Sequence, residues 1–348
     1  MSSDDEIDKY ERLVKIGQGA FAEVFIVKNR TTNKLFTMKI SIQSDIEVLN
    51  DPIVVREAKI LRTLEHWNVI KLIDYSSYPE KSLLLNRESS SALSITEFCP
   101  FSLSKLIVNP EFHFEELEIK SIVWQLILGL DYLHEKGLVH GDLRPSNILM
   151  TKTGAVKLSD FGLATYLDLP YLLSIPPVDH NWNLPSPAMW YAPPEELLGR
   201  GYHGIAADTW RLGCIIPEMW TKKPIMKGSN RIEQLVQIFE LCGSVQLESW
   251  PDVESYPFFD KTILPMDCRR QLSTRLKSEI NDEKIVTMID EMLIINPIFR
   301  LPSSKTLDWL SFINREDFQP WLFTPMLDRY MNCNEAELPH LGLQEVNR

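Results

Sequence analysis

The chain has 348 residues, of which 44% are apolar and 24% are charged. These proportions are ordinary for a globular protein and exclude a collagen-like, coiled-coil or wholly disordered chain. The net charge of −12 argues against sequence-independent binding to nucleic acid, which depends on clustered lysine and arginine. We therefore expect one large two-lobed domain or two ordinary domains, with no direct nucleic-acid partner.

The five cysteines are widely spaced, and none belongs to a C-x-x-C pair. This spacing predicts neither a disulfide framework nor a structural zinc site, and it favours a reducing compartment. The acidic first ten residues lack the apolar stretch of a signal peptide, and no apolar run reaches the roughly 18 residues of a membrane span. We expect a cytoplasmic or nuclear protein without a membrane partner.

The first third of the chain predicts strands and one helix. Short apolar runs alternate with glycines or with a polar turn, as in consecutive antiparallel strands. The predicted strands lie at 13–16, 24–27, 35–40, 69–75 and 92–98, and the predicted helix lies at 52–64.

The remainder of the chain predicts helices. A single apolar stripe with helical spacing is formed by Ile119, Ile122, Val123, Leu126, Leu130 and Leu133. Gly137 stands where this helix should end. Helical patterns return over 206–315, where Pro217 predicts a kink or a local break. A β-rich part joined near 97–103 to an α-rich part predicts an α+β fold with two lobes.

Two glycines, Gly17 and Gly19, separate the first two predicted strands. Such a turn lets backbone N–H groups approach phosphate oxygens, although a plain hairpin turn is the commoner explanation. Lys39 follows inside an apolar strand, where a lysine either extends to the surface or needs a partner. Glu57, on the predicted helix that follows, is the candidate partner.

The middle of the chain narrows these alternatives. Asp142 and Asn147 place a carboxylate and an amide five residues apart, and Asp160 begins an Asp-Phe-Gly motif thirteen residues later. The motif Pro-Pro-Glu follows at 193–195. A three-residue motif arises by chance in some chains, but the whole ordered set is not credible as coincidence.

This ordered set resembles the protein kinase family over about residues 10–315. The resemblance implies a two-lobed protein kinase fold, with an N-lobe over 10–97 and a C-lobe over 98–315, between an acidic tail at 1–9 and a C-terminal tail at 316–348. It also implies ATP and Mg²⁺ as cofactors, in a reaction that needs mainly positioning and neutralisation of charge.

The resemblance assigns a role to each residue of the site. Lys39 would hold the α- and β-phosphates and be oriented by Glu57. Asp142 would accept or orient the substrate hydroxyl, and Arg144 would stand beside the γ-phosphate. The metal ligands would be Asn147 and Asp160. The nucleotide-binding residues would be Ile16, Gly17, Gln18, Gly19, Val24, Lys39, Glu97, Cys99 and Leu149.

The same resemblance implies supporting contacts around these residues. Thr96 would be a small gatekeeper beside the adenine. A hydrophobic spine with its buried anchor would be formed by Leu61, His140, Phe161 and Asp208. Glu195 would pair with Arg300 in a structural role.

Two segments narrow the resemblance to one subfamily. Residues 52–57, PIVVRE, are similar to the PITALRE helix of cyclin-dependent kinases, and residues 219–253 are similar to the transcriptional members. The resemblance is closest to the elongation kinases partnered by cyclin T in positive transcription elongation factor b. It implies a nuclear serine/threonine kinase that binds a T-like cyclin through the helix carrying Glu57 and phosphorylates the C-terminal repeats of RNA polymerase II.

The activation segment departs from the family pattern. In relatives, three arginines clamp an activating phosphothreonine. Here Arg56 is retained, Gly141 and Thr165 occupy the other two positions, and no threonine lies within 166–195. We therefore hypothesise that activity does not need phosphorylation of this segment.

Further departures affect substrate choice and leave an alternative function open. Ala188 replaces a threonine that hydrogen-bonds the catalytic aspartate, Ala192 replaces an arginine that helps select proline after the target residue, and Thr37 adds bulk above the adenine.

The leading hypothesis is an active, divergent kinase, because the residues that handle Mg-ATP are retained. The alternative is a pseudokinase that binds ATP or cyclin without efficient catalysis. A small-molecule kinase is a weaker third reading.

Overall fold

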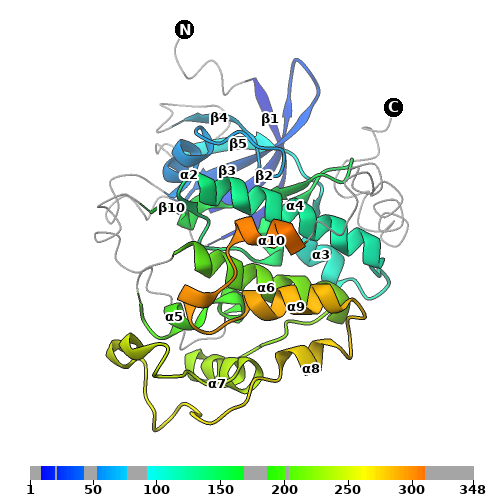
Figure 1. The fold of residues 1–348 in the computed structure, drawn as a ribbon. Coiled ribbons are helices and arrows are strands. Elements are labelled where there is room, and N and C mark those ends of the chain that lie inside the picture. Colours follow the sequence, from blue (N-terminus) through cyan, green and yellow to red (C-terminus); the bar gives the residue numbers. More distant parts are fainter. Residues whose placement is uncertain are drawn as a thin grey trace.

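The computed structural model describes residues 9–19, 22–42, 53–76, 92–167, 186–200 and 204–309. These residues form two lobes, one rich in strands and one rich in helices (Figure 1). The predicted α+β architecture is therefore confirmed. The predicted tails at 1–9 and 316–348 lie outside the described residues, except for Lys9.

The N-terminal lobe is built on one antiparallel sheet with the strand order β1-β2-β3-β5-β4. Its strands are β1 (Tyr10–Gln18), β2 (Ala22–Asn29), β3 (Leu35–Ser41), β4 (Leu72–Ser76) and β5 (Leu93–Glu97). The buried side chains of the sheet form a small core around Tyr10, Val27, Met38 and Ile95. In the register of the sheet, Lys39 lies opposite Val24 on one side and Ser94 on the other, which places Lys39 at the centre of the sheet.

Helix α2 (Ile53–Leu61) packs against this sheet and continues the core into the second lobe. Its last residues, Ile60 and Leu61, belong to the large hydrophobic cluster of the C-terminal lobe. The segment after α2 is tied to that lobe by hydrogen bonds from the amide of Leu158 to the carbonyl of Asn68, 2.8 Å, and from the amide of Ile70 to the carbonyl of Leu158, 2.9 Å. These contacts fix α2 relative to both lobes.

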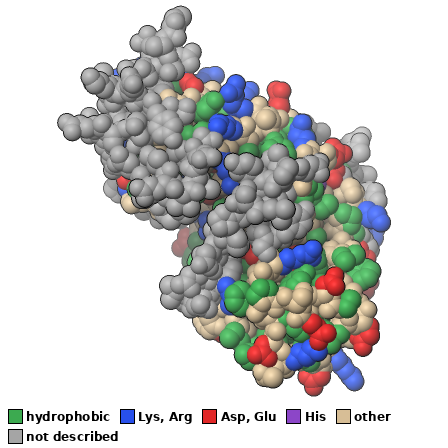
Figure 2. Space-filling model, turned by 90° about the vertical axis from the view of Figure 1, so that its left-hand side faces the viewer, with side chains coloured by type: hydrophobic (Ala, Val, Ile, Leu, Met, Phe, Trp, Pro, Cys, Tyr) green, Lys and Arg blue, Asp and Glu red, His purple; other side chains and the backbone are tan. Residues whose placement is uncertain are grey.

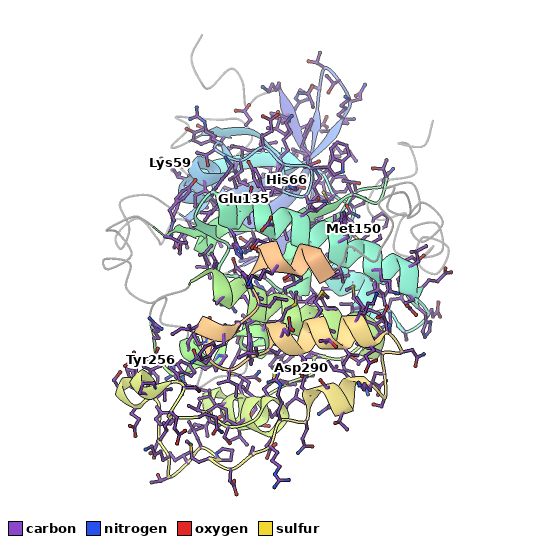
Figure 3. All side chains as sticks on the ribbon, viewed as in Figure 1. Lys59, His66, Glu135, Met150, Tyr256 and Asp290 are labelled. Atoms are coloured by element: carbon purple, nitrogen blue, oxygen red, sulfur yellow. The ribbon has the colours of Figure 1, made fainter. Side chains whose placement is uncertain are left out.

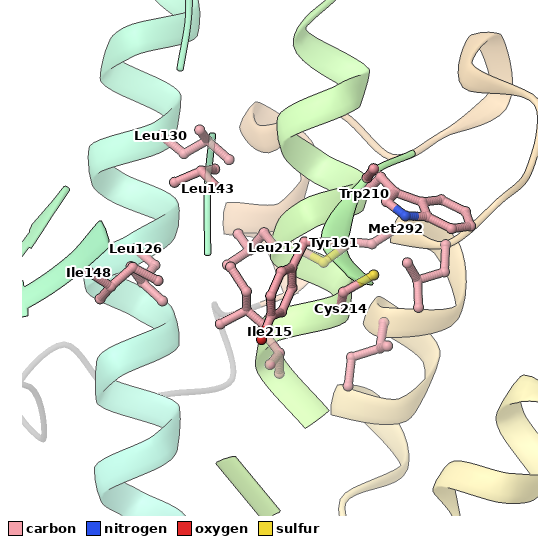
Figure 4. Packing of buried hydrophobic residues seen from close by; sticks show 14 of the residues in the cluster. Leu126, Leu130, Leu143, Ile148, Tyr191, Trp210, Leu212, Cys214, Ile215 and Met292 are labelled. Carbon is pink, nitrogen blue, oxygen red and sulfur yellow. The ribbon is translucent and has the colours of Figure 1, made fainter. Parts of the chain in front are cut away.

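The C-terminal lobe is organised around two buried helices, α4 (Glu116–Glu135) and α6 (Ile205–Thr221). Figure 4 shows Leu126 and Leu130 of α4 facing Leu143 and Ile148, while α6 presents Leu212 and its neighbours to the same core. The six residues of the predicted stripe on α4 are all buried. Gly137, with φ of +67°, ends the helix as predicted, because its left-handed conformation suits glycine.

Shorter helices surround this pair. They are α3 (Leu103–Val108), α5 (Pro194–Leu197), α7 (Arg231–Cys242), α8 (Leu272–Leu276), α9 (Glu283–Met292) and α10 (Ser303–Trp309), with 3₁₀ turns at 145–147, 161–163, 187–191, 251–255 and 297–299. Helix α9 packs on α6, and α10 crosses α4 (Figure 1). Among the described helices, none has both the length and the hydropathy that a membrane span requires.

Helix α6 is continuous through Pro217, so the predicted local break is wrong. Proline in a helix interior removes one backbone hydrogen bond at a cost of about 3 kcal/mol. Every residue from Ala207 to Met219 is buried, and burial of each large apolar side chain contributes about 1.5–3 kcal/mol. Packing therefore outweighs the local penalty.

Short strands complete the junction between the lobes. They are β6 (Phe101–Ser102), β7 (Leu138–Val139), β8 (Ile148–Met150), β9 (Val156–Leu158) and β10 (Thr165–Tyr166). Strand β8 lies between β6 and β9, and β7 pairs with β10. These pairings bring the loops at 140–147 and 159–164 to the face of the C-terminal lobe that meets the sheet. On the face shown in Figure 2, basic, acidic and apolar side chains are interspersed over the described part.

Candidate active site

Lys39 has two carboxylate partners, one from each lobe. Its Nζ lies 2.7 Å from Oε2 of Glu57 on α2 and 2.8 Å from Oδ1 of Asp160, which precedes the 3₁₀ turn at 161–163. The choice that the sequence left open is thereby decided, because Lys39 turns to a buried partner and not to the surface. Three residues that are far apart in the sequence thus form one charged cluster.

Charge complementarity keeps Lys39 and Asp160 ionised, whereas burial raises the pKa of Glu57 above its ordinary value. Burial lowers the pKa of Lys39, but the carboxylates of Glu57 and Asp160 outweigh that effect and leave the pKa raised above its ordinary value. Burial also opposes ionisation of Asp160, yet the neighbouring ammonium of Lys39 holds the pKa of this carboxyl below its ordinary value. At neutral pH the pair is therefore a cation beside an anion, as expected when opposite charges lie within about 4 Å of each other.

The Asp-Phe-Gly motif is fixed to α2 by its backbone. The amide of Phe161 donates to Oε1 of Glu57 at 3.2 Å, so both oxygens of this carboxylate are engaged. The ring of Phe161 packs on His140 with centroids 4.8 Å apart. This contact is one that the implied spine requires, and Leu61, the third residue of that spine, is buried in the same cluster as Phe161.

Asp208, buried in α6, holds the loop that carries Asp142. Its Oδ2 accepts from the amide of His140 at 2.7 Å, and its Oδ1 accepts from the amide of Gly141 at 2.9 Å. Gly141 has φ of +79°, a backbone conformation that glycine adopts at little cost. The side chain of His134 also contacts Asp208 Oδ2, at 3.1 Å.

Asp142 is oriented by two neighbours on its own loop. The Nδ2 atom of Asn147 donates both to Oδ2 of Asp142, at 2.9 Å, and to its carbonyl, at 2.8 Å. The Nε atom of Arg144 lies 3.2 Å from the same Oδ2. The carboxylate is therefore held in one orientation, next to a positive charge.

The oxygen atoms near Asp160 suit Mg²⁺, which prefers oxygen ligands and is bound in proteins by one or two carboxylates together with substrate phosphates. Because Asn147 donates through its Nδ2, its Oδ1 is the atom that can face a metal. The hydroxyl of Ser146 donates to this Oδ1 at 3.2 Å. Among the described residues, no group of three or more His, Cys, Asp or Glu side chains is placed to bind a metal by itself. A bound Mg²⁺ would thus depend on Asp160, Asn147 and the phosphates of a nucleotide.

The glycine-rich turn lies above this cluster at the end of β1. Ile16, Gln18 and Gly19 are exposed, and the amide of Gly19 donates to the carbonyl of Ala22 at 2.8 Å. Gly17 lies opposite Val24 in the register of β1 and β2, and a Cβ on Gly17 would lie 3.7 Å from that of Val24. The tip of the turn, residues 20–21, lies outside the described residues.

The segment that joins the lobes follows β5. Oε1 of Glu97 accepts from Lys157, at 2.9 Å, and from the amide of Lys71, at 2.8 Å. Cys99 is partly buried, and burial raises the pKa of its thiol to about 12, which keeps it protonated. Leu149 is half-buried on β8, within the short sheet below this segment.

Sequence reasoning missed a set of buried polar contacts below the site. Arg211 on α6 forms an ion pair with Glu196, and Tyr191 donates to Glu218. The available signal was an arginine between apolar neighbours, Trp-Arg-Leu, where a charged side chain needs a partner. Local patterns alone do not say which partners these are.

Comparisons with known proteins agree with this geometry. The model of the protein kinase domain matches residues 10–309. Cyclin-dependent kinase 9-A of Xenopus laevis is 38% identical over 307 residues, which cover 87% of this chain and 80% of the relative. Cyclin-dependent kinase 9 of Homo sapiens is 37% identical over 305 residues with the same coverage. A chain in the crystal structure of the yeast RNA Pol II CTD kinase CTDK-1 complex has a TM-score of 0.70 and 27% identity, covering 86% of this chain and 90% of that one.

Proposed function

Because this chain belongs to the protein kinases and, within them, to the cyclin-dependent kinases, we propose that it transfers phosphate from ATP to serine or threonine in the C-terminal repeats of RNA polymerase II. The observation that best supports a catalytic function is the cluster in which Lys39 contacts both Glu57 and Asp160. A cation held between the two lobes in this way is placed for phosphate oxygens. The similarity to a chain of the yeast RNA Pol II CTD kinase complex supports the choice of substrate.

The side chains divide the work of phosphoryl transfer, which depends mainly on positioning and on charge neutralisation. Bound Mg-ATP would supply the transferable phosphoryl group and the charge of the metal. Lys39 would hold phosphate oxygens, and Asp160 with Asn147 would hold the metal. Asp142 would accept the proton of the substrate hydroxyl, while Arg144 offers a positive charge beside it.

We also infer that the enzyme works without phosphorylation of its activation segment. Nη2 of Arg56 donates to the carbonyl of Ala164 at 2.8 Å, and Oγ1 of Thr63 lies 2.8 Å from the hydroxyl of Tyr166. Side chains of α2 and of the turn after it are thus joined directly to the start of the segment. An activating kinase that raised turnover many-fold by modifying the segment would contradict this inference.

We propose that a T-like cyclin binds at α2 in the nucleus. Lys59 is exposed on this helix, at the outer side of the N-terminal lobe (Figure 3). Reversing its charge with Lys59→Glu should weaken cyclin binding about tenfold in a titration. Lys34→Glu, in the exposed turn between β2 and β3, is the matched control and should bind normally. Equal affinity of both variants would exclude α2 as the contact.

The proposed activity is tested by phosphoryl transfer from Mg-ATP to a polymerase-repeat peptide and to a generic basic peptide, with and without a T-type cyclin. Asp142→Asn should reduce transfer at least a hundredfold, because general-base residues contribute about 10²–10⁴-fold. Asp252→Asn, on the exposed surface of the C-terminal lobe, should retain full activity. Transfer by the wild type no greater than by Asp142→Asn would favour the pseudokinase, and nucleotide binding without Mg²⁺ would agree with it.

A further inference from the structure

Two arginines of the C-terminal lobe lie against aromatic rings. Nη1 of Arg200 donates to the hydroxyl of Tyr256 at 3.0 Å, and the guanidinium carbon of Arg200 lies 5.8 Å from the centre of that ring. The guanidinium carbon of Arg231, the first residue of α7, lies 3.6 Å from the centre of the ring of Phe258. Guanidinium groups are attracted to aromatic faces, and they still present N–H groups at their edge. We call these four residues the arginine–aromatic patch.

The ring of Phe258 brings the two arginines to one place on the surface. It lies 2.7 Å from the position that a Cβ on Gly199 would occupy, so it packs directly on the residue before Arg200. Gly199 has φ of +93°, which glycine adopts at little cost. Phe258 is 48% exposed, and Tyr256 lies at the outer edge of the lobe (Figure 3). An exposed ring is thus bordered by both cations.

Backbone hydrogen bonds hold the patch in shape. The amide of Arg200 donates to the carbonyl of Glu195 at 2.9 Å, and the amide of Phe258 donates to the carbonyl of Leu198 at 3.1 Å. Glu195 is itself paired with Arg300 in the interior of the lobe. The two loops that carry the patch are therefore fastened to each other and to the core, so a ligand that binds here need not order the backbone.

The patch is positively charged although the whole chain carries a net charge of −12. The partner of Arg200 is a neutral hydroxyl, which leaves its charge uncompensated by that contact. The carboxylate of Glu254, two residues before Tyr256, is paired with Lys261. The carboxylate of Asp260 accepts from the amide and the hydroxyl of Thr262. An anionic ligand at the patch therefore meets positive charge.

A phosphate group suits this combination of side chains. It carries a charge of about −1.5 to −2 at neutral pH and has three acceptor oxygens, and a guanidinium binds it through two parallel N–H···O bonds. Clusters of arginine commonly recognise phosphorylated peptides, and the rings beside these arginines offer an apolar surface to the residues that flank the phosphate. The proposed enzyme forms such peptides itself, because its product is a phosphorylated repeat.

We propose that the arginine–aromatic patch binds phosphoserine in polymerase repeats that have already been phosphorylated, and so retains a long substrate while unmodified repeats reach Asp142. The choice of this ligand rests on the proposed function. A repeat array that is attached at one point presents its other repeats to the active site at an effective concentration of roughly 1 mM. The patch would therefore favour substrates with many repeats over single repeats.

A binding titration tests the patch without any phosphate transfer. A labelled polymerase-repeat peptide with one phosphoserine should bind the wild type about tenfold more tightly than its unphosphorylated form, as expected for charge-assisted hydrogen bonds. The double variant Arg200→Gln with Arg231→Gln should bind both forms equally. Arg200→Lys with Arg231→Lys keeps the charge and should also lose most of the preference, because an ammonium lacks the planar fork.

A matched control removes the same charge elsewhere on the lobe. Arg269 and Arg275 are exposed, and the double variant Arg269→Gln with Arg275→Gln should keep the preference for the phosphopeptide. Since salt screens exposed charges beyond about 10 Å at 0.1 M, both double variants are compared at this ionic strength. The comparison separates recognition at the patch from a general effect of net charge.

Kinetics then test whether the patch retains a substrate. For a substrate of several repeats with one phosphoserine at its end, the KM should rise about tenfold in the Arg200 and Arg231 glutamine variant. The KM values for a single unphosphorylated repeat and for ATP should not change.

Three results would overturn the proposal: equal binding of the two peptide forms by the wild type, equal losses in the patch variant and the Arg269 control, or an unchanged KM for the long substrate. If the wild type transferred no phosphate to any peptide, the proposed function would fail. The titration would still decide whether the patch recognises phosphoserine, so the two failures are distinguishable.

Discussion

Replacing Gly141 by alanine should disturb the active site more than the loss of a glycine elsewhere. Gly141 precedes Asp142 and has φ of +79°, and a Cβ at this position would lie 2.8 Å from the carbonyl oxygen of Leu163. A left-handed conformation costs a residue with a Cβ about 1–2 kcal/mol. The contact with the carbonyl is too short to persist, so the backbone near Leu163 must also move.

Gly137 offers a matched control within the same lobe. Its φ is +67°, and nothing lies within 4 Å of the position of a Cβ. Gly137→Ala should therefore lower the free energy of unfolding by about 1 kcal/mol, which is the cost of the left-handed conformation alone. Gly141→Ala should lower it by about 3 kcal/mol in total. At about 2 °C for each kcal/mol in a chain of this size, the two midpoints of thermal unfolding should differ by about 4 °C.

Phosphate transfer should separate the two glycine variants further. A displacement of about 1 Å at a reacting group can cost on the order of a hundredfold in rate, so Gly141→Ala should lose most of its kcat and Gly137→Ala should keep it. Gly141→Arg, which restores the residue found in related kinases, should behave like Gly141→Ala. Equal unfolding midpoints and equal kcat for the two alanine variants would refute the reasoning.

Three further variants test other parts of the structure. Lys39→Met leaves the carboxylate of Asp160 without its cation and should lower kcat/KM for ATP at least a hundredfold, measured against the wild type at saturating peptide. Arg300→Met leaves without its partner the carboxylate of Glu195, which Arg300 binds at 2.8 and 2.9 Å. Thermal unfolding should show that the free energy of unfolding falls by about 3–5 kcal/mol. A fall of less than about 1 kcal/mol would contradict this expectation. Burial raises the pKa of Glu218 to about 7, so the folded protein keeps a proton that the unfolded chain releases near its ordinary value. The free energy of unfolding should therefore fall as the pH rises from about 5 to 7, and Glu218→Gln should remove that slope in unfolding curves recorded across this range.

Local patterns in the sequence were enough to predict the elements that support the site. The apolar stripe of α4 is buried along its full length, because a repeat of 3.6 residues determines which side chains share a face. The helix predicted at 52–64 is observed as Ile53–Leu61, since the ends of helices depend on capping contacts that periodicity does not encode. The family resemblance also anticipated the pair of Glu195 and Arg300.

Contacts between distant residues were decided only by the tertiary structure. Lys39 and Asp160 are 121 positions apart, and nothing local to Lys39 says whether its side chain reaches the surface or a carboxylate. Pro217 predicted a kink or a local break, and packing of α6 prevents the break, because buried side chains along the helix outweigh one lost hydrogen bond. Likewise, the sequence around Arg211 does not show that its partner is Glu196, fifteen residues away, until the fold pairs them. The sequence by itself determined which segments form helices and strands and which residues carry the chemistry; the burial of those segments against one another determined which charges meet.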